Sequence, residues 1–348
     1  MSTETWMRRC FDLASLGRGR THLNPPVGAV IICENRIIGE GWHKGFGQPH
    51  AEVEAIRSVK SEDLHLLPKS TIFVSLEPCS YHGKTPPCSQ LIIKHQIPHV
   101  VVSVKDPNPK VAGRGIDQLK EAGINVTEGV LENGGKALIR SFSRNQLSGR
   151  PRITLKFACS ADGFVGQKDK RTPLSNAVSN QLVHRLRAES DAIAIGRKTA
   201  VIDNPQLTTR NYPGKNPVRL VFSRTGVLDE KLKIFDRCAP TVLVTPEKDK
   251  KATKPLPNGH SRLTSAPTLT QTVEKIFQKL HACSLLVEGG PELMSEFIAE
   301  ECWDEIIKIV CPVTLQEGVK APDLRGLAPS FRYSVGGDVW VHYLREGG

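Results

Sequence analysis

The sequence predicts an α/β protein built from two domains. Strand-like and helix-like segments alternate through the first half of the chain, and the alternation restarts after "LSGRPR" at residues 147–152. Such alternation is typical of layered α/β folds, and a segment with Ser, Gly and Pro is typical of a linker. The 348 residues also suit two domains of ordinary size. We therefore expect domains at residues 1–146 and 150–348.

The expected elements follow from the hydrophobic pattern. In the first domain, short apolar runs predict strands at residues 27–33, 37–42, 71–76, 99–104 and 124–129, and helical patterns begin at Thr3, His50, Cys88 and Gly115. In the second domain, strands are predicted at 152–158, 191–196, 217–222, 241–245, 284–289 and 305–310, and helices at 180–189, 268–279 and 292–299. A Lys- and Pro-rich stretch at 246–267 predicts an exposed loop.

The composition excludes disordered and fibrous classes, since 39% of residues are hydrophobic and 24% are charged. The net charge is +11, and aromatic residues make up only 5% of the chain. A basic chain with few aromatic residues to stack on bases favours small phosphorylated substrates over nucleic acid. No apolar run is long enough to cross a bilayer, and the N-terminus lacks a signal-peptide core. Because the nine cysteines are scattered, they indicate reduced thiols, and we expect a cytoplasmic protein without a membrane partner.

Three residues have the pattern of a catalytic zinc site. His50 begins a helix in "HAE", Cys79 follows a strand in "EPC", and Cys88 comes nine positions later. Catalytic zinc takes three protein ligands of this kind and keeps a fourth position for water, which becomes hydroxide near neutral pH. Glu52 lies two residues after His50, within reach of that water, and can pass its proton to a leaving amine. The pattern matches the His-x-Glu and Pro-Cys signature of zinc deaminases.

The spacing of the cysteines departs from that signature. Eight residues, "SYHGKTPP", separate Cys79 from Cys88, where the signature has two. We expect this insert to arch beside the active site toward the substrate. The alternative is a closed structural zinc site with His82 as the fourth ligand, but it leaves Glu52 without a role. Three other histidines are interpreted as surface or packing residues: His43, His65 and His99.

A Gly-Gly turn between a strand and a helix predicts a phosphate-binding loop in the second domain. In "LLVEGGPELMSEF", residues 285–297, amides at the helix start can bind a pyrophosphate, and glycine lets it approach closely. The signal is weak alone, because such turns also merely connect strand to helix and the G-x-G-x-x-G pattern is absent. Arg187 and Arg210 suit a phosphate because guanidinium groups match its oxygens, although Arg187 also fits a solvated helix position.

Five segments together resemble one bacterial family: "NPPVGAV", "HAEVEAI", "LEPCSYHGKTPPC", "DPNPKVAGRG" and "DNPQLTTR". Over nearly its whole length the chain is similar to the bifunctional deaminase/reductase family of riboflavin biosynthesis. The resemblance implies a cytidine-deaminase-like three-layer domain followed by a dihydrofolate-reductase-like domain. It also implies zinc-dependent deamination of 2,5-diamino-6-(5-phosphoribosylamino)pyrimidin-4-one, followed by NADPH-dependent reduction of the ribosyl group to ribityl.

The resemblance assigns roles residue by residue. It implies substrate contacts at Asn24, Lys84, Lys156, Arg171, Arg187, Leu207, Arg210 and Glu288. It implies cofactor contacts at Ala158, Pro173, Thr199, Asp203, Ser223, Gly290, Pro291, Glu292, Leu293, Met294, Ser295 and Glu296. The chain departs from the family pattern at Tyr81, Arg171, Pro173, Arg197 and Lys198. These departures leave open whether Tyr81 or His82 contacts the pyrimidine, and whether the reductase half is weakened.

Two other functions remain open from the residues. A nucleic-acid base deaminase with an appended domain predicts tight, salt-dependent binding of tRNA or DNA. A non-catalytic binding module stabilised by zinc predicts that Glu52→Gln leaves function intact. The sequence does not fix the oligomeric state, and a homo-oligomer is one of the open answers.

Overall fold

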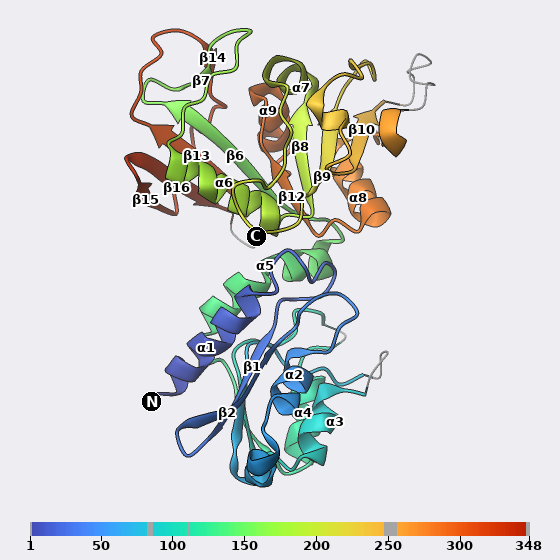
Figure 1. Ribbon diagram of the computed structural model, residues 1–348, viewed down its shortest axis with the longest axis vertical. Helices are drawn as coiled ribbons and strands as arrows, with labels where there is room; N and C mark the ends of the chain where they lie inside the picture. The colour runs from blue at the N-terminus through green and yellow to red at the C-terminus, as the bar shows by residue number, and fades with distance from the viewer. Residues whose placement is uncertain (1, 82–85, 110, 247–255, 346–348) are drawn as a thin grey trace. The chain divides into compact units, whose positions relative to one another are not determined.

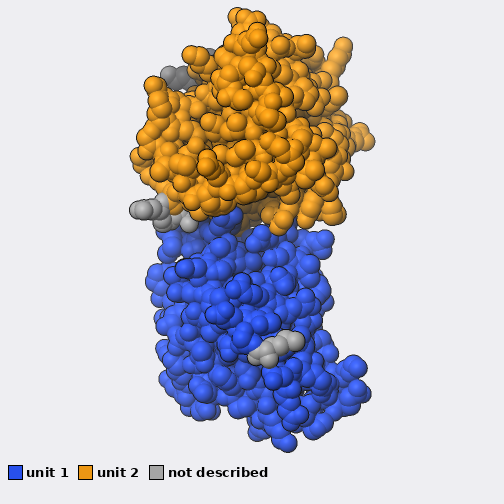
Figure 2. Space-filling model, turned by 90° about the vertical axis from the view of Figure 1, so that its left-hand side faces the viewer, with its two compact units in different colours: residues 1–148 blue, residues 149–348 orange. Residues whose placement is uncertain are grey.

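The computed structural model describes residues 2–81, 86–109, 111–246 and 256–345 (Figure 1). The chain divides into two compact units, residues 1–148 and 149–348 (Figure 2). Each unit contains its own sheet and its own hydrophobic core. The predicted α/β fold class is therefore confirmed.

Unit 1 is a five-stranded sheet with helices on both faces. Its strands lie in the order β2-β1-β3-β4-β5, and their bounds are β1 (Gly28–Cys33), β2 (Arg36–Trp42), β3 (Thr71–Val74), β4 (His99–Val102) and β5 (Asn125–Thr127). The strand β1 pairs antiparallel with β2 and β3, whereas β3, β4 and β5 run parallel. The helices are α1 (Thr3–Ser15), α2 (Ala51–Arg57), α3 (Cys88–Lys94), α4 (Arg114–Glu121) and α5 (Glu132–Ser148).

Alternating side chains of β1 point to opposite faces of this sheet. Ala29 and Ile31 join the core formed with α2, α3 and α4. Val30 and Ile32 join the core formed with α1 on the other face, where α5 lies beside α1 (Figure 1). This period of two is what a strand buried on both faces requires. The three-layer arrangement implied by the family resemblance is confirmed.

The helix α5 is an element that the sequence pattern does not predict. Gly134 and Gly135 lie inside it, and glycine in a helix interior costs about 1 kcal/mol relative to alanine. Both glycines allow close packing, because a Cβ at Gly134 would lie 2.6 Å from the Phe11 ring and one at Gly135 would lie 2.5 Å from the Ser103 Oγ. Tertiary contact therefore outweighs helix propensity here. The helix continues to Ser148, two residues beyond the expected domain end.

Unit 2 is a nine-stranded sheet in the order β11-β10-β9-β8-β12-β6-β13-β16-β15, with a separate two-stranded pair, β14-β7. The strands that lie from β11 to β13 in this order run parallel, and β13, β16 and β15 pair antiparallel. The strand bounds are β6 (Arg152–Ser160), β7 (Phe164–Gly166), β8 (Ala192–Gly196), β9 (Val218–Phe222), β10 (Thr241–Thr245), β11 (Ser261–Thr264), β12 (Ser284–Val287), β13 (Glu305–Cys311), β14 (Val319–Lys320), β15 (Phe331–Val335) and β16 (Asp338–Leu344).

Helices cover both faces of this sheet. They are α6 (Ala177–Glu189), α7 (Arg197–Asp203), α8 (Leu269–Leu280) and α9 (Pro291–Ala299). The helices α8 and α9 share a core with one set of alternating strand residues, and α6 and α7 pack against the other set. The strand β11 lies inside the stretch expected to be an exposed loop, so that expectation is wrong for Ser261–Thr264. Among the described residues, no helix is long and apolar enough to span a membrane.

Candidate functional site

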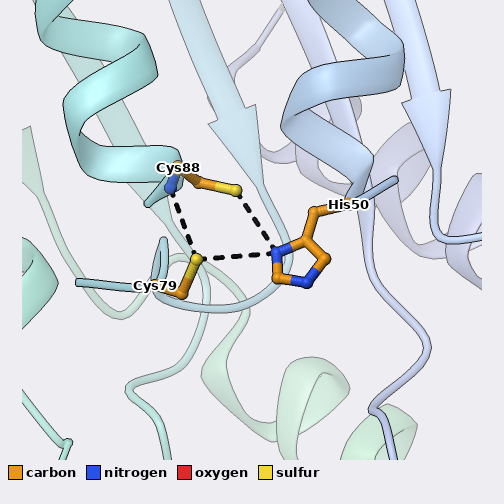
Figure 3. Close-up of side chains that lie close together, drawn as sticks. All are labelled: His50, Cys79 and Cys88. Atoms are coloured by element: carbon orange, nitrogen blue, oxygen red, sulfur yellow. Dashed lines mark hydrogen bonds between the residues drawn. The ribbon is translucent and has the colours of Figure 1, made fainter. Parts of the chain in front are cut away.

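In unit 1, the side chains of His50, Cys79 and Cys88 converge on one point (Figure 3). The His50 Nδ1 lies 3.5 Å from the Cys79 Sγ and 3.4 Å from the Cys88 Sγ. In a tetrahedral zinc site with bonds of about 2.0 Å to nitrogen and 2.3 Å to sulfur, these ligand atoms would be separated by about 3.6 Å. The donor set and its spacing therefore fit zinc.

Three structural elements position these donors. His50 is the N-cap of α2, Cys79 follows the end of β3, and Cys88 is the first residue of α3. The Cys88 amide donates a hydrogen bond to the Cys79 sulfur at 3.3 Å. Hydrogen bonding with Cys88, opposed by burial and assisted by His50, lowers the pKa of Cys79 to about 4. A thiolate is the form of cysteine that binds metal, so Cys79 is held in its ligating state.

The Glu77 carboxylate holds the segment before Cys79 in place. It is buried and accepts hydrogen bonds from the amides of Asp106, Gly113 and Gly115, at 3.1, 2.9 and 2.9 Å. Sequence reasoning missed this role, although Glu77 belongs to the "EPC" motif. The contact joins two of the segments that carry the family resemblance, because "DPNPKVAGRG" supplies all three amides.

We expect Gly115→Ala to destabilise unit 1 and loosen the metal site. A Cβ at Gly115 would lie 1.9 Å from the backbone oxygen of Pro78, so the backbone next to Cys79 would have to move. Overpacking of this kind costs about 1–3 kcal/mol. Thermal unfolding and zinc content of the full-length protein would measure the effect. In the matched control Gly45→Ala, the nearest atom to the new Cβ is 3.4 Å away, and unchanged stability in both variants would contradict the prediction.

Glu52 lies beside the cluster without belonging to it. It is 4% exposed and follows His50 by two residues, on the first turn of α2. Among the described residues, the group of potential ligand atoms within 4.8 Å of one another contains His50, Cys79 and Cys88 alone. Burial, followed by the charge on Cys79, raises the pKa of Glu52 to about 7. A carboxylate in this position can exchange a proton with water at the metal.

The structure describes only some of the residues that were predicted to contact the pyrimidine. Asn24 is half-buried and pairs with His43, which is 2% exposed and so is the packing kind of the two predicted for it, not the surface kind. Burial lowers the pKa of His43. Tyr81 is 60% exposed, whereas Lys84 and His82 lie outside the described residues.

In unit 2, three predicted substrate residues form one ion-pair cluster. Lys156 on β6, Arg187 on α6 and Glu288 after β12 meet within the fold. The Glu288 carboxylate accepts from the Arg187 Nε and Nη2 at 2.7 and 2.8 Å, and the Lys156 Nζ lies 3.2 Å away. Burial opposes ionisation of Glu288, but Arg187 and Lys156 lower its pKa to about 2. Arg187 therefore orients Glu288, and its contact with a phosphate stays a prediction.

His184, which sequence reasoning missed, adjoins this cluster. It lies on α6 and is 1% exposed. Burial first, and then the charges of Arg187 and Arg210, lower its pKa to about 4. Its Nδ1 has no hydrogen-bond partner among the described residues.

The loop predicted to bind the cofactor packs against Thr199 at Gly289 and Gly290. A Cβ on Gly290 would lie 2.8 Å from the Thr199 Oγ1, and Gly289 packs against the same side chain. The Gly196 amide bonds to the Gly289 oxygen at 3.0 Å. These residues lie at the carboxyl ends of β8 and β12, where open parallel sheets bind nucleotides. The location of the loop at this edge of the sheet therefore fits a dinucleotide.

The other predicted residues of unit 2 differ in accessibility. The side chains of Leu207, Leu293 and Met294 are buried in the core, so only their backbone can meet a ligand. Burial raises the pKa of Asp203, and the charge of Arg171 opposes this rise. Ser223 is buried and accepts from the Gly226 amide. Ala158 and Pro291 are half-buried, and the remaining ones are exposed: Arg171, Pro173, Arg210, Glu292, Ser295 and Glu296.

Two family models match the chain. Residues 1–104 match the cytidine and deoxycytidylate deaminase zinc-binding region, and residues 151–330 match the RibD C-terminal domain. The riboflavin biosynthesis protein RibD of Aquifex aeolicus (strain VF5) is 34% identical over 324 residues, covering 92% of this chain and 90% of that protein. RibD of Escherichia coli (strain K12) is 32% identical and covers 99% of this chain and 100% of that protein.

Solved structures give the same result. The deaminase/reductase of Thermotoga maritima has a TM-score of 0.90, with 33% identity and coverage of 98% of both chains. One form of Acinetobacter baumannii RibD has a TM-score of 0.86, with 31% identity and the same coverage of both chains. The predicted zinc-binding deaminase domain and NADPH-using reductase domain are confirmed. The chain belongs to the RibD family of bifunctional deaminases and reductases in riboflavin biosynthesis.

Proposed function

We propose that this chain carries out two consecutive reactions on one phosphorylated pyrimidine. The first is hydrolytic deamination of 2,5-diamino-6-(5-phosphoribosylamino)pyrimidin-4-one, and the second is NADPH-dependent reduction of its ribosyl group to ribityl. The main support is the His50, Cys79 and Cys88 cluster beside a buried Glu52, in a chain that matches a structure named for both activities. The basic net charge of +11 suits a phosphorylated substrate.

In the deaminase unit, His50, Cys79 and Cys88 would hold the zinc ion. When bound, zinc supplies a Lewis acid that lowers the pKa of water. The Glu52 carboxylate takes a proton from the attacking water and passes it to the departing amino nitrogen, so one group serves as base and then acid. Asn24 and Lys84 bind the pyrimidine and its attached groups.

In the reductase unit, the residues at the carboxyl ends of the parallel strands would bind NADPH and the ribotide. When bound, NADPH supplies the hydride. Thr199, Gly290 and the first turn of α9 line the cofactor, whereas Lys156 and Glu288 face the opened ribose carbon. Arg187 fixes the Glu288 carboxylate through two hydrogen bonds, and Arg210 is the phosphate contact.

Incubating the pure full-length protein with the diaminopyrimidine ribotide tests both halves. We expect ammonia release without NADPH, and NADPH oxidation only when the ribotide is present. Absence of ammonia release would overturn the deaminase assignment. Ammonia release without NADPH oxidation would mean that the departures at Arg171, Pro173, Arg197 and Lys198 have weakened the reductase half.

A further inference from the structure

His43 and Asn24 meet at one end of the antiparallel pair formed by β1 and β2. In that pair Gly28 is opposite Trp42, so the residues just before β1 lie beside those just after β2. The His43 amide bonds to the Val27 oxygen at 2.9 Å, which continues the pairing by one step. The Asn24 Nδ2 then lies 3.0 Å from the His43 Nε2. The His43 ring in turn lies edge-on to the His50 ring, with centroids 5.6 Å apart.

The hydrogen bonds of His43 determine which way the Asn24 amide faces. The His43 Nδ1 lies 3.0 Å from the backbone oxygen of Pro49, and a carbonyl oxygen can only accept. Nδ1 therefore carries the ring hydrogen, and in the neutral ring Nε2 is a bare acceptor. The Asn24 Nδ2 donates to that acceptor, which leaves the Asn24 Oδ1 facing away from His43. Among the described residues the Oδ1 has no hydrogen-bond partner.

We infer that His43 is a positioning residue of the deaminase, which locks the Asn24 amide so that its Oδ1 accepts a hydrogen bond from the pyrimidine. This inference rests on the proposed function, in which Asn24 contacts the substrate. Amino groups and a ring N–H are the donors that the diaminopyrimidine offers. A flipped Asn24 amide would turn its own N–H groups toward those donors, and the contact would be lost. His43 touches no substrate and acts only through the orientation of Asn24.

Two substitutions separate the two hydrogen bonds of His43. In His43→Asn, the shorter amide can still donate to the Pro49 oxygen, since its nitrogen replaces Nδ1, but nothing reaches Asn24. In His43→Gln, the side-chain oxygen reaches the position of Nε2 and still accepts from Asn24, but the bond to Pro49 is lost. A purely structural role through Pro49, the residue before His50, would make His43→Gln the more damaged variant.

We expect His43→Asn to raise the KM for deamination about tenfold, as for loss of one oriented hydrogen bond, with kcat changed less than about threefold. His43→Gln should recover most of the loss. Zinc content and reductase activity should stay unchanged in both variants. In an Asn24→Ala background, His43→Asn should add nothing, because its effect passes through Asn24. The control His99→Asn removes a histidine bonded to Thr127 in the same unit and should behave as wild type.

Binding can be measured without turnover by titrating the ribotide into Glu52→Gln protein with and without His43→Asn. We expect about tenfold weaker binding in the double variant. Equal affinities, a larger loss in His43→Gln, or additive effects of Asn24→Ala and His43→Asn would overturn the inference. If the wild-type protein released no ammonia but His43→Asn still weakened ribotide binding, the proposed deamination alone would be overturned.

Discussion

Glu52→Gln should abolish deamination while leaving zinc and the reductase in place. Glutamine keeps the size and position of the side chain but cannot take up the proton of the attacking water or deliver it to the departing nitrogen. General acid–base catalysis of this kind contributes about 10²–10⁴-fold, so we expect ammonia release to fall by a factor in that range. The measurement is single-turnover deamination, with zinc content and NADPH oxidation followed on the same preparation.

Cys79→Ser is the informative contrast to Glu52→Gln. It removes one of three ligand atoms, and we expect it to lose zinc and deamination together. Glu52→Gln loses deamination alone, because Glu52 is outside the ligand cluster. If Glu52→Gln protein released ammonia at the wild-type rate, Glu52 would not be the group that moves the proton in deamination.

The zinc cluster could be predicted from the sequence because its chemistry is local. "HAE" and "EPC" each place a ligand next to a strand–helix junction, and zinc selects those residue types. The supporting contacts could not be predicted in the same way. The amides that bond to Glu77 come from residues 29 to 38 positions away, and His43 reaches Asn24 across 19 positions. Such partners are determined by the register of the strands and the packing of helices, which a local pattern does not contain.

In unit 2 the buried parallel strands were recognisable as apolar runs, whereas the edge hairpin was not predicted. The strands β15 and β16 are joined at Gly336 and Gly337, which have φ values of 56° and 97°. A Gly-Gly pair between two alternating segments is a hairpin signal, so the information was present in "FRYSVGGDVWVHYL". The contact between Arg187 and Glu288 could not be predicted for a different reason. A helix arginine can meet a phosphate or a carboxylate equally well, and its contact with Glu288 follows from the fold of the chain, which a local pattern does not contain.

Glu288→Gln should strongly destabilise unit 2. It would leave the Lys156 and Arg187 side chains, only 10% and 12% exposed, without their shared counter-charge. Removing one partner of a buried ion pair costs about 3–5 kcal/mol. We expect reductase activity to be lost and the unit to unfold at lower denaturant, with deamination retained. The matched control is Asp323→Asn, which removes an exposed ion pair with Arg325 and should cost less than about 1 kcal/mol.

The effect of Glu288→Gln should also depend on pH. The pKa of Glu288 is about 2 in the folded protein, below its ordinary value of 4.5. A lowered folded pKa gives stability that is fully present above the unfolded value and is lost as the pH falls through the folded value. The stability gap between wild type and Glu288→Gln should therefore be largest near neutral pH and shrink from about pH 4.5 toward pH 2. Denaturant unfolding at several pH values measures it, and a gap that stays constant over that range would show that the two cations do not stabilise the carboxylate.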